Sequence, residues 1–91
     1  MKNFPQDVTA YKKTPEFTEI SVPQGLSNDH STKEGVWGKI VVLEGELEYT
    51  IQEPTVEVIT LTPNLNGVVE PTVKHHVKPL GPVKFYVEFY R

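Results

Sequence analysis

The feature that most constrains this chain is a run of β-branched and aromatic residues between residues 36 and 62, interrupted only by short turns. In residues 46–51, apolar side chains alternate with glutamate and threonine, as in a half-buried antiparallel strand. Residues 83–90 alternate in the same way, with Phe85 and Phe89 on one face. No apolar period of 3.6 residues is sustained for a helix. The chain is therefore predicted to be all-β.

Glycine, proline and asparagine separate the predicted strands. They occur in Glu44-Gly45-Glu46, in Glu53-Pro54 and in residues 63–67, where they favour turns. Strands that recur at intervals of about eight to twelve residues are typical of a sandwich or a small barrel. In such a fold the ligand site usually lies in the barrel mouth.

The length of 91 residues is enough for one domain with a modest core, so we expect a single domain over residues 1–91. Prolines at positions 5, 15 and 23 withhold backbone donors and fix φ, which favours extended chain and edge strands. Residues 1–16 are accordingly predicted to form an extended N-terminal arm.

Composition excludes several classes of protein. Nine Lys and Arg against twelve Asp and Glu give a net charge of −3, which argues against a nucleic-acid partner. The apolar run of residues 40–43 is too short to cross a membrane, and the N-terminus lacks the apolar region of a secretory signal. We therefore expect a cytoplasmic protein. The absence of cysteine excludes disulfides, thiolate zinc sites and cysteine nucleophiles.

The three histidines are the side chains best suited to bind a transition metal or to move protons near neutral pH. His75 and His76 are adjacent in a segment that follows Pro71, and His30 lies far away in the sequence. Because strand side chains alternate, only one of the adjacent pair can point into a barrel. The alternative is that both are surface or hydrogen-bonded turn residues.

Other candidate groups have simpler explanations. Asp29-His30-Ser31 contains the residue types of a hydrolase triad, but contiguous residues cannot form the required chain of hydrogen bonds. The glutamates at positions 44, 46 and 48 are either an acid/base cluster or a solvated strand face that discourages edge aggregation, and we expect the solvated face. Trp37, between Gly35 and Gly38, is predicted to be a core anchor or a pocket wall.

Three segments, residues 30–45, 69–75 and 85–90, closely resemble the TehB/YeaR-like family of small cupin-like domains, which is associated with tellurite resistance. The resemblance extends from about Tyr11 to Tyr90, with its elements in the same order. It implies a double-stranded β-helix, the small barrel or jelly roll of cupins. It also places the two family histidines on His30 and His75, so that His75 faces inward and His76 outward.

The same resemblance shows where this chain departs from metal-dependent cupins. Their first motif carries two histidines and a glutamate ahead of the hairpin glycine, and counting back from Gly45 places the glutamate on Gly38. Glycine has no side chain to ligate a metal. A divalent ion such as zinc would therefore depend on His30 and His75, completed by Glu88 or by water.

Our leading hypothesis is that the domain binds a small ligand, a metal ion or an oxyanion inside the barrel, in a tellurite-resistance or related stress role. His30 and His75 would be its polar contacts, and Trp37 and Tyr86 its walls. The chain contains no Gly-rich loop between a strand and a helix, so we expect no methyltransferase activity.

Two alternatives belong to other classes. In the first, the domain is a non-catalytic interaction module with a packed interior, which forms a homodimer through its outer sheet face or through its arm. In the second, it is a metal-dependent cupin enzyme such as a dioxygenase, which requires two histidines and a carboxylate. Glu88 or Glu34 would have to supply that carboxylate.

Overall fold

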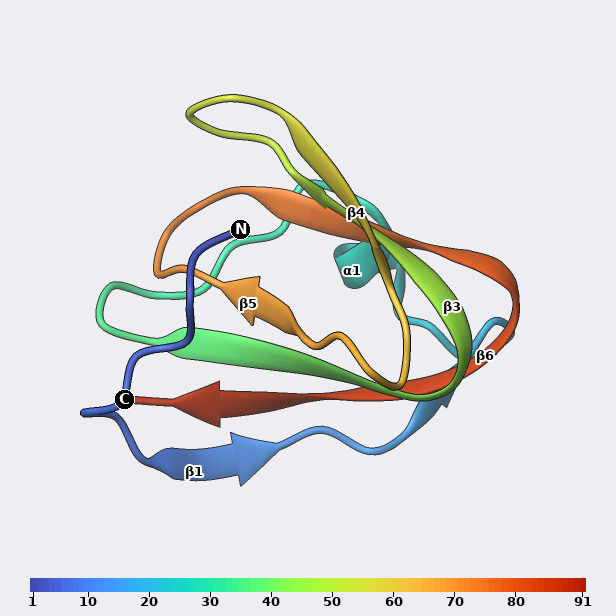
Figure 1. Ribbon diagram of the computed structural model, residues 1–91, viewed down its shortest axis with the longest axis horizontal. Helices are drawn as coiled ribbons and strands as arrows, with labels where there is room; N and C mark the ends of the chain where they lie inside the picture. Colours follow the sequence, from blue (N-terminus) through green and yellow to red (C-terminus); the bar gives the residue numbers. More distant parts are fainter.

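The computed structural model describes all residues from 1 to 91, and almost all of its regular structure is β-sheet (Figure 1). The single helix, α1, has four residues, so the chain has no helix that could span a membrane. All strand pairs are antiparallel, which confirms the all-β prediction. The elements are β1 (Ala10–Lys13), β2 (Phe17–Thr18), α1 (Gln24–Ser27), β3 (Trp37–Ile51), β4 (Glu57–Leu61), β5 (Gly67–Val69) and β6 (His75–Tyr90).

The two long strands, β3 and β6, pair with each other from Trp37 opposite Tyr90 to Ile51 opposite His75. Both strands bend at the same place, so one half of the paired strands folds over the other half (Figure 1). The outer strands divide between the two halves of β3, since β5 pairs with its beginning and β4 with its end. The sheet therefore folds into two halves that face each other.

The bend occurs where the sequence predicted a turn at Glu44-Gly45-Glu46, and that prediction was wrong. β3 runs through this segment without a break, and its pairing with β6 shifts register on both sides of Gly45. Such bulges add a residue to one strand and bend it. Gly45 has a φ of 79°, a conformation that residues with a Cβ rarely adopt.

The other predicted turns are confirmed, since residues 52–56 connect β3 to β4 and residues 62–66 connect β4 to β5. The last strand is longer than predicted, because β6 begins at His75 and continues through Pro79 and Pro82. These two prolines lie at the bend, where the register with β3 is interrupted.

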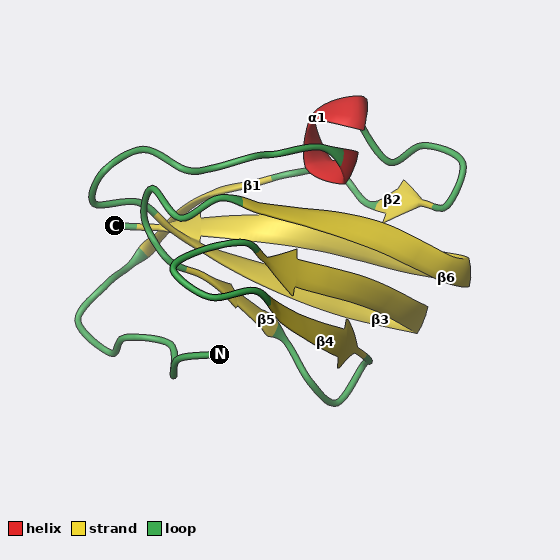
Figure 2. Cartoon of the chain, turned by 90° about the horizontal axis from the view of Figure 1, so that it is seen from above, coloured by secondary structure: helices red, strands yellow, loops and turns green.

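The N-terminal residues predicted as an arm lie partly in the chain's own sheet. β1 pairs with the end of β6, and β2 pairs with β6 through Phe17 and Phe85. Figure 2 shows α1 and β2 together on one side of the molecule, next to β6. The sheet order β1-β6-β3-β4 leaves β1 and β4 at the edges.

The core fills the space between the two halves of the sheet. Leu47, Leu61 and Phe85 are completely buried, and the core consists of the inward residues of both long strands. Burial of a side chain of this size stabilises the fold by about 2 kcal/mol. Tyr49 is also buried, and its hydroxyl donates a hydrogen bond of 2.8 Å to the carbonyl oxygen of Val68. This bond ties the second half of β3 to β5.

The bend at Gly45 makes a specific prediction for stability. In Gly45→Ala the new Cβ would collide with the carbonyl oxygen of Pro82 and would occupy a left-handed conformation. We expect the free energy of unfolding to fall by about 2 kcal/mol or more, measured by urea denaturation. The control is Gly25→Ala in α1, where nothing lies within 4 Å of the added Cβ; an equal loss in both variants would contradict this role of Gly45.

Candidate functional site

The two histidines that the sequence analysis selected lie side by side, although 45 positions separate them in the chain. His30 and His75 form an isolated antiparallel bridge in which each N–H donates to the other's carbonyl oxygen at 2.8 Å. Their imidazole rings meet edge to face, with centroids 5.3 Å apart and planes at 86°. The backbone pairing fixes the position of both Cα atoms, so the rings are held together by the fold.

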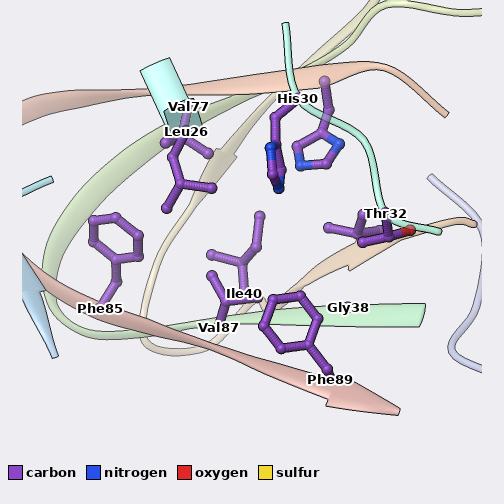
Figure 3. A pocket seen from close by; sticks show the side chains of 11 residues that line it. Leu26, His30, Thr32, Gly38, Ile40, Val77, Phe85, Val87 and Phe89 are labelled. Atoms are coloured by element: carbon purple, nitrogen blue, oxygen red, sulfur yellow. The ribbon is translucent and has the colours of Figure 1, made fainter. Parts of the chain in front are cut away.

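Both rings line a small cavity between the two halves of the sheet (Figure 3). His75 enters it from the start of β6, His30 from the segment before β3, and Leu26 of α1 covers one side. The two imidazoles are the only titratable groups in its lining, which is otherwise mainly aliphatic and aromatic. Its volume is about 10 Å³, which is about the space that one water needs.

His75 is an uncharged imidazole at neutral pH. Only 3% of the residue is exposed, and this burial lowers its pKa. The hydrogen bond to Val73 acts in the opposite direction, and the neighbouring His30 and His76 add to the lowering. Its Nδ1 lies 3.2 Å from the carbonyl oxygen of Val73. Because a carbonyl oxygen can only accept, Nδ1 carries the proton and Nε2 keeps a lone pair. A backbone partner of this kind fixes the tautomer of many metal-binding histidines.

His76 lies on the other face of β6, as the alternation predicted. It does not line the cavity, and its Nδ1 is 3.1 Å from the side-chain oxygen of Gln52. The adjacent histidines therefore belong to different surroundings, and only His75 is part of the site.

The remaining predicted site residues lie away from the cavity. Glu88 alternates with Val87 and Phe89, so it is on the outer face of β6, where its carboxylate accepts a hydrogen bond from Tyr90. Trp37 is also on the outer face, with its ring centroid 6.2 Å from that of Phe4. The period of two in a strand explains these positions, because the inward places are held by core residues.

Tyr86 is on the outer face as well, with the Lys13 ammonium 4.4 Å from its ring centroid. No group of three or more His, Cys, Asp or Glu residues in the chain is placed to hold a metal ion. Glu88 therefore does not join the two histidines, and any ion between them would need further ligands from water or from a bound molecule.

Sequence reasoning missed Thr32 and Phe89, which also line the cavity. The Thr32 hydroxyl donates to the carbonyl oxygen of Val36 at 2.7 Å, and its carbonyl accepts from the Thr72 N–H at 3.1 Å. These bonds fix the segment between His30 and β3. No sequence motif points to Thr32, which lies among polar loop residues. Phe89 could have been found, because the alternation of the last strand puts it on the same inward face as Phe85.

A family model for the TehB-like domain matches residues 12–87. The chain belongs to the TehB-like domain family. Two relatives from Haemophilus influenzae are named probable S-adenosyl-L-methionine-dependent methyltransferase TehB, and they are 36% (strain Rd) and 33% (strain 10810) identical over 85 residues. These matches cover 89% of this chain but 29% of each relative.

Solved structures agree with this assignment. The crystal structure of TehB from Haemophilus influenzae superimposes with a TM-score of 0.83 at 32% identity, covering 91% of this chain and 31% of that one. A protein from Escherichia coli K12 superimposes with a TM-score of 0.87 at 21% identity, covering all of this chain and 97% of that one. The second similarity shows that the same fold occurs in a chain of about this length.

The buried His75 predicts a dependence of stability on pH. Its pKa is lower in the folded protein than in the unfolded chain, so the unfolded chain binds more protons once the pH falls below the ordinary value near 6.5. This contribution to stability is complete above about pH 6.5 and is lost as the pH falls toward the lowered pKa. We expect the melting temperature to fall between pH 7.5 and pH 5, and to fall less in His75→Gln.

The matched control for this measurement is His76→Gln, which removes the neighbouring imidazole on the other face. It is expected to retain most of the pH dependence of the wild type, because burial is the largest cause of the lowered pKa of His75. Identical pH profiles for the wild type and His75→Gln would contradict the assignment of the titration to His75.

Proposed function

We propose that this chain is a cupin-like binding domain whose cavity accepts a small ligand at His30 and His75, with a divalent cation such as zinc as the favoured occupant. The observation that carries the proposal is the pair of imidazoles 5.3 Å apart, clamped by two backbone hydrogen bonds, in an otherwise apolar cavity. Two histidines provide part of a metal site and leave the other coordination positions open.

The side chains that line the cavity give an oxyanion no cationic partner, whereas His75 offers a lone pair to a cation. The uncharged His75 presents a lone pair at Nε2, which binds a cation and repels an anion. The apolar lining supplies no cationic group to replace the hydration of an oxyanion. A buried cation is also costly unless it is paired, and here the two imidazoles would be its protein ligands. A cavity of about 10 Å³ has room for one group of about the size of water, which is too little for a polyatomic oxyanion.

Family membership supports the biological part of the proposal. The relatives in Haemophilus influenzae are named as probable methyltransferases, but this chain corresponds to less than a third of their length. We infer a binding role for this domain in tellurite resistance or a related stress response in the cytoplasm, without methyl transfer by the domain itself.

A metal titration tests the cavity. With protein that has not been exposed to chelators or affinity metal, Zn²⁺ is expected to raise the melting temperature of the wild type by about 5 °C, because it binds only the folded state. The shift should be lost in His30→Gln and His75→Gln and retained in His76→Gln. Tellurite is expected to give no shift through these histidines.

Two results would refute the metal assignment. One is a wild type whose melting temperature does not respond to any divalent ion and which contains no stoichiometric metal by elemental analysis. The other is a zinc shift that His76→Gln removes as completely as His75→Gln does, which would indicate surface binding.

A second candidate function, a non-catalytic dimerising module, is favoured by a separate observation. The interior is nearly filled by its own side chains, whereas Val56 and Val58 beside and within the edge strand β4 are 65% and 58% exposed. An edge strand has unpaired backbone groups, and apolar side chains next to it favour pairing with a second copy. We infer that such a homodimer would form through β4.

Light scattering tests the dimer. If the chain dimerises through β4, the wild type has twice the mass of one chain and Val58→Lys has the mass of one chain, because a lysine on an edge strand opposes pairing. The control Leu80→Lys changes another exposed apolar residue, 44% exposed, away from β4. A monomeric wild type at concentrations on the order of 1 mM would eliminate the dimer.

A further inference from the structure

A second hollow, wider and more open than the cavity, lies beside it. It has a volume of about 420 Å³, and we name it the basic groove because its lining includes Lys12, Lys33 and Arg91. Lys12 belongs to β1, Lys33 to the segment that precedes β3, and Arg91 follows β6. The groove and the cavity share His30, Thr32 and Phe89, so these three residues separate the two spaces.

The charge of the basic groove is opposite to that of the whole protein. The chain has a net charge of −3, yet no carboxylate side chain lines the groove. The three ion pairs of the protein involve the N-terminus, Lys2 and Lys84. Lys12, Lys33 and Arg91 are thus free of ion pairs, and cationic groups around a concave surface concentrate a positive potential there.

Unused hydrogen-bond donors accompany these cations. No hydrogen bond within the protein involves the backbone N–H groups of Ser31, Thr32 and Lys33 or the Ser31 hydroxyl. The Thr32 hydroxyl, by contrast, already donates to Val36. Backbone N–H groups are almost always paired with protein, water or ligand, so these donors are open to water or to a ligand in the groove.

The groove also contains an apolar surface. Tyr11, Val36 and Phe89 are part of its lining, and the Arg91 guanidinium lies 4.0 Å from the centroid of the Tyr11 ring. This stacking fixes the direction of the cation and leaves its N–H groups available. A volume of about 420 Å³ is in the range of sites for small organic molecules, and an inorganic oxyanion would fill only a part of it.

We propose that the basic groove binds a small organic anion, a molecule with one phosphate or carboxylate group on an aromatic or apolar body. The anionic group interacts with Lys12, Lys33 and the free donors of residues 31–33, and the body packs on Tyr11 and Phe89. This site is separate from the proposed cation site, because none of its cationic side chains lines the cavity.

Phenyl phosphate is a suitable probe, with benzoate as the carboxylate version. Titration followed by backbone amide NMR should give saturable shifts at residues 31–33 and at Arg91. Lys12→Glu and Lys33→Glu are each expected to weaken binding about tenfold, since each reverses a charge at the site. Lys78→Glu makes the same change in net charge at an exposed residue outside the groove, and it should leave the affinity unchanged.

Two partial probes test the two parts of the site. Inorganic phosphate and phenol should each bind at least tenfold more weakly than phenyl phosphate. The proposal is overturned if phenyl phosphate shows no saturation at concentrations on the order of 10 mM, or if Lys78→Glu weakens binding as much as Lys33→Glu. His75→Gln should retain phenyl phosphate binding and lose the zinc-induced rise in melting temperature. The proposal for the groove and the proposal for the cavity can therefore be refuted separately.

Discussion

The pairing of β3 with β6 is the interaction on which the rest of this structure depends. The two strands remain paired through a bend at Gly45, and the bend brings the beginning of the pair over its end. Every other strand attaches to one of these two: β1 and β2 to β6, β4 and β5 to β3. The core and the cavity exist because the bent pair encloses them, and the short strands and α1 close the sides.

Polar groups inside this enclosure are satisfied by backbone carbonyls. The Tyr49 hydroxyl donates to Val68 and the His75 imidazole to Val73, and no buried polar side-chain atom lacks a partner. Burial raises the pKa of Tyr49 and lowers that of His75, so both groups are uncharged. The Tyr49 and His75 rings are also in contact, with centroids 5.8 Å apart. His75 therefore has a fixed position, tautomer and charge, which are the properties that a binding site requires.

The sequence predicted the strand class well because alternation is a local signal. It failed at Gly45, since a glycine in a bulge has the same sequence signature as a glycine in a turn, and only the partner strand distinguishes them. His30 and His75 were paired through the family resemblance, because nothing local relates residues so distant. The outer placement of Tyr86 and Glu88 was predictable, as both alternate with the core residues Phe85 and Val87.

The basic groove, in contrast to the strands, could not be predicted from any local pattern in the sequence. Lys12, Lys33 and Arg91 come from three separate parts of the chain, and only folding brings them to one hollow. The composition, with its excess of acidic residues, had argued only against a nucleic-acid partner. The net charge of the whole chain therefore says little about the charge of one site. The groove is positive because three cationic side chains, and no acidic ones, line it.

The two proposed sites are physically linked through His30. Its backbone pairs with His75 at the cavity, and the next three residues carry the free donors of the basic groove. Under the two proposals, a cation and an anion would bind in two spaces that share His30 in their lining, and unlike charges attract. Each ligand would then increase the affinity for the other, by the same factor in both directions. The positive charge of the groove opposes a cation in the cavity when the groove is empty, so an anion in the groove would remove that opposition.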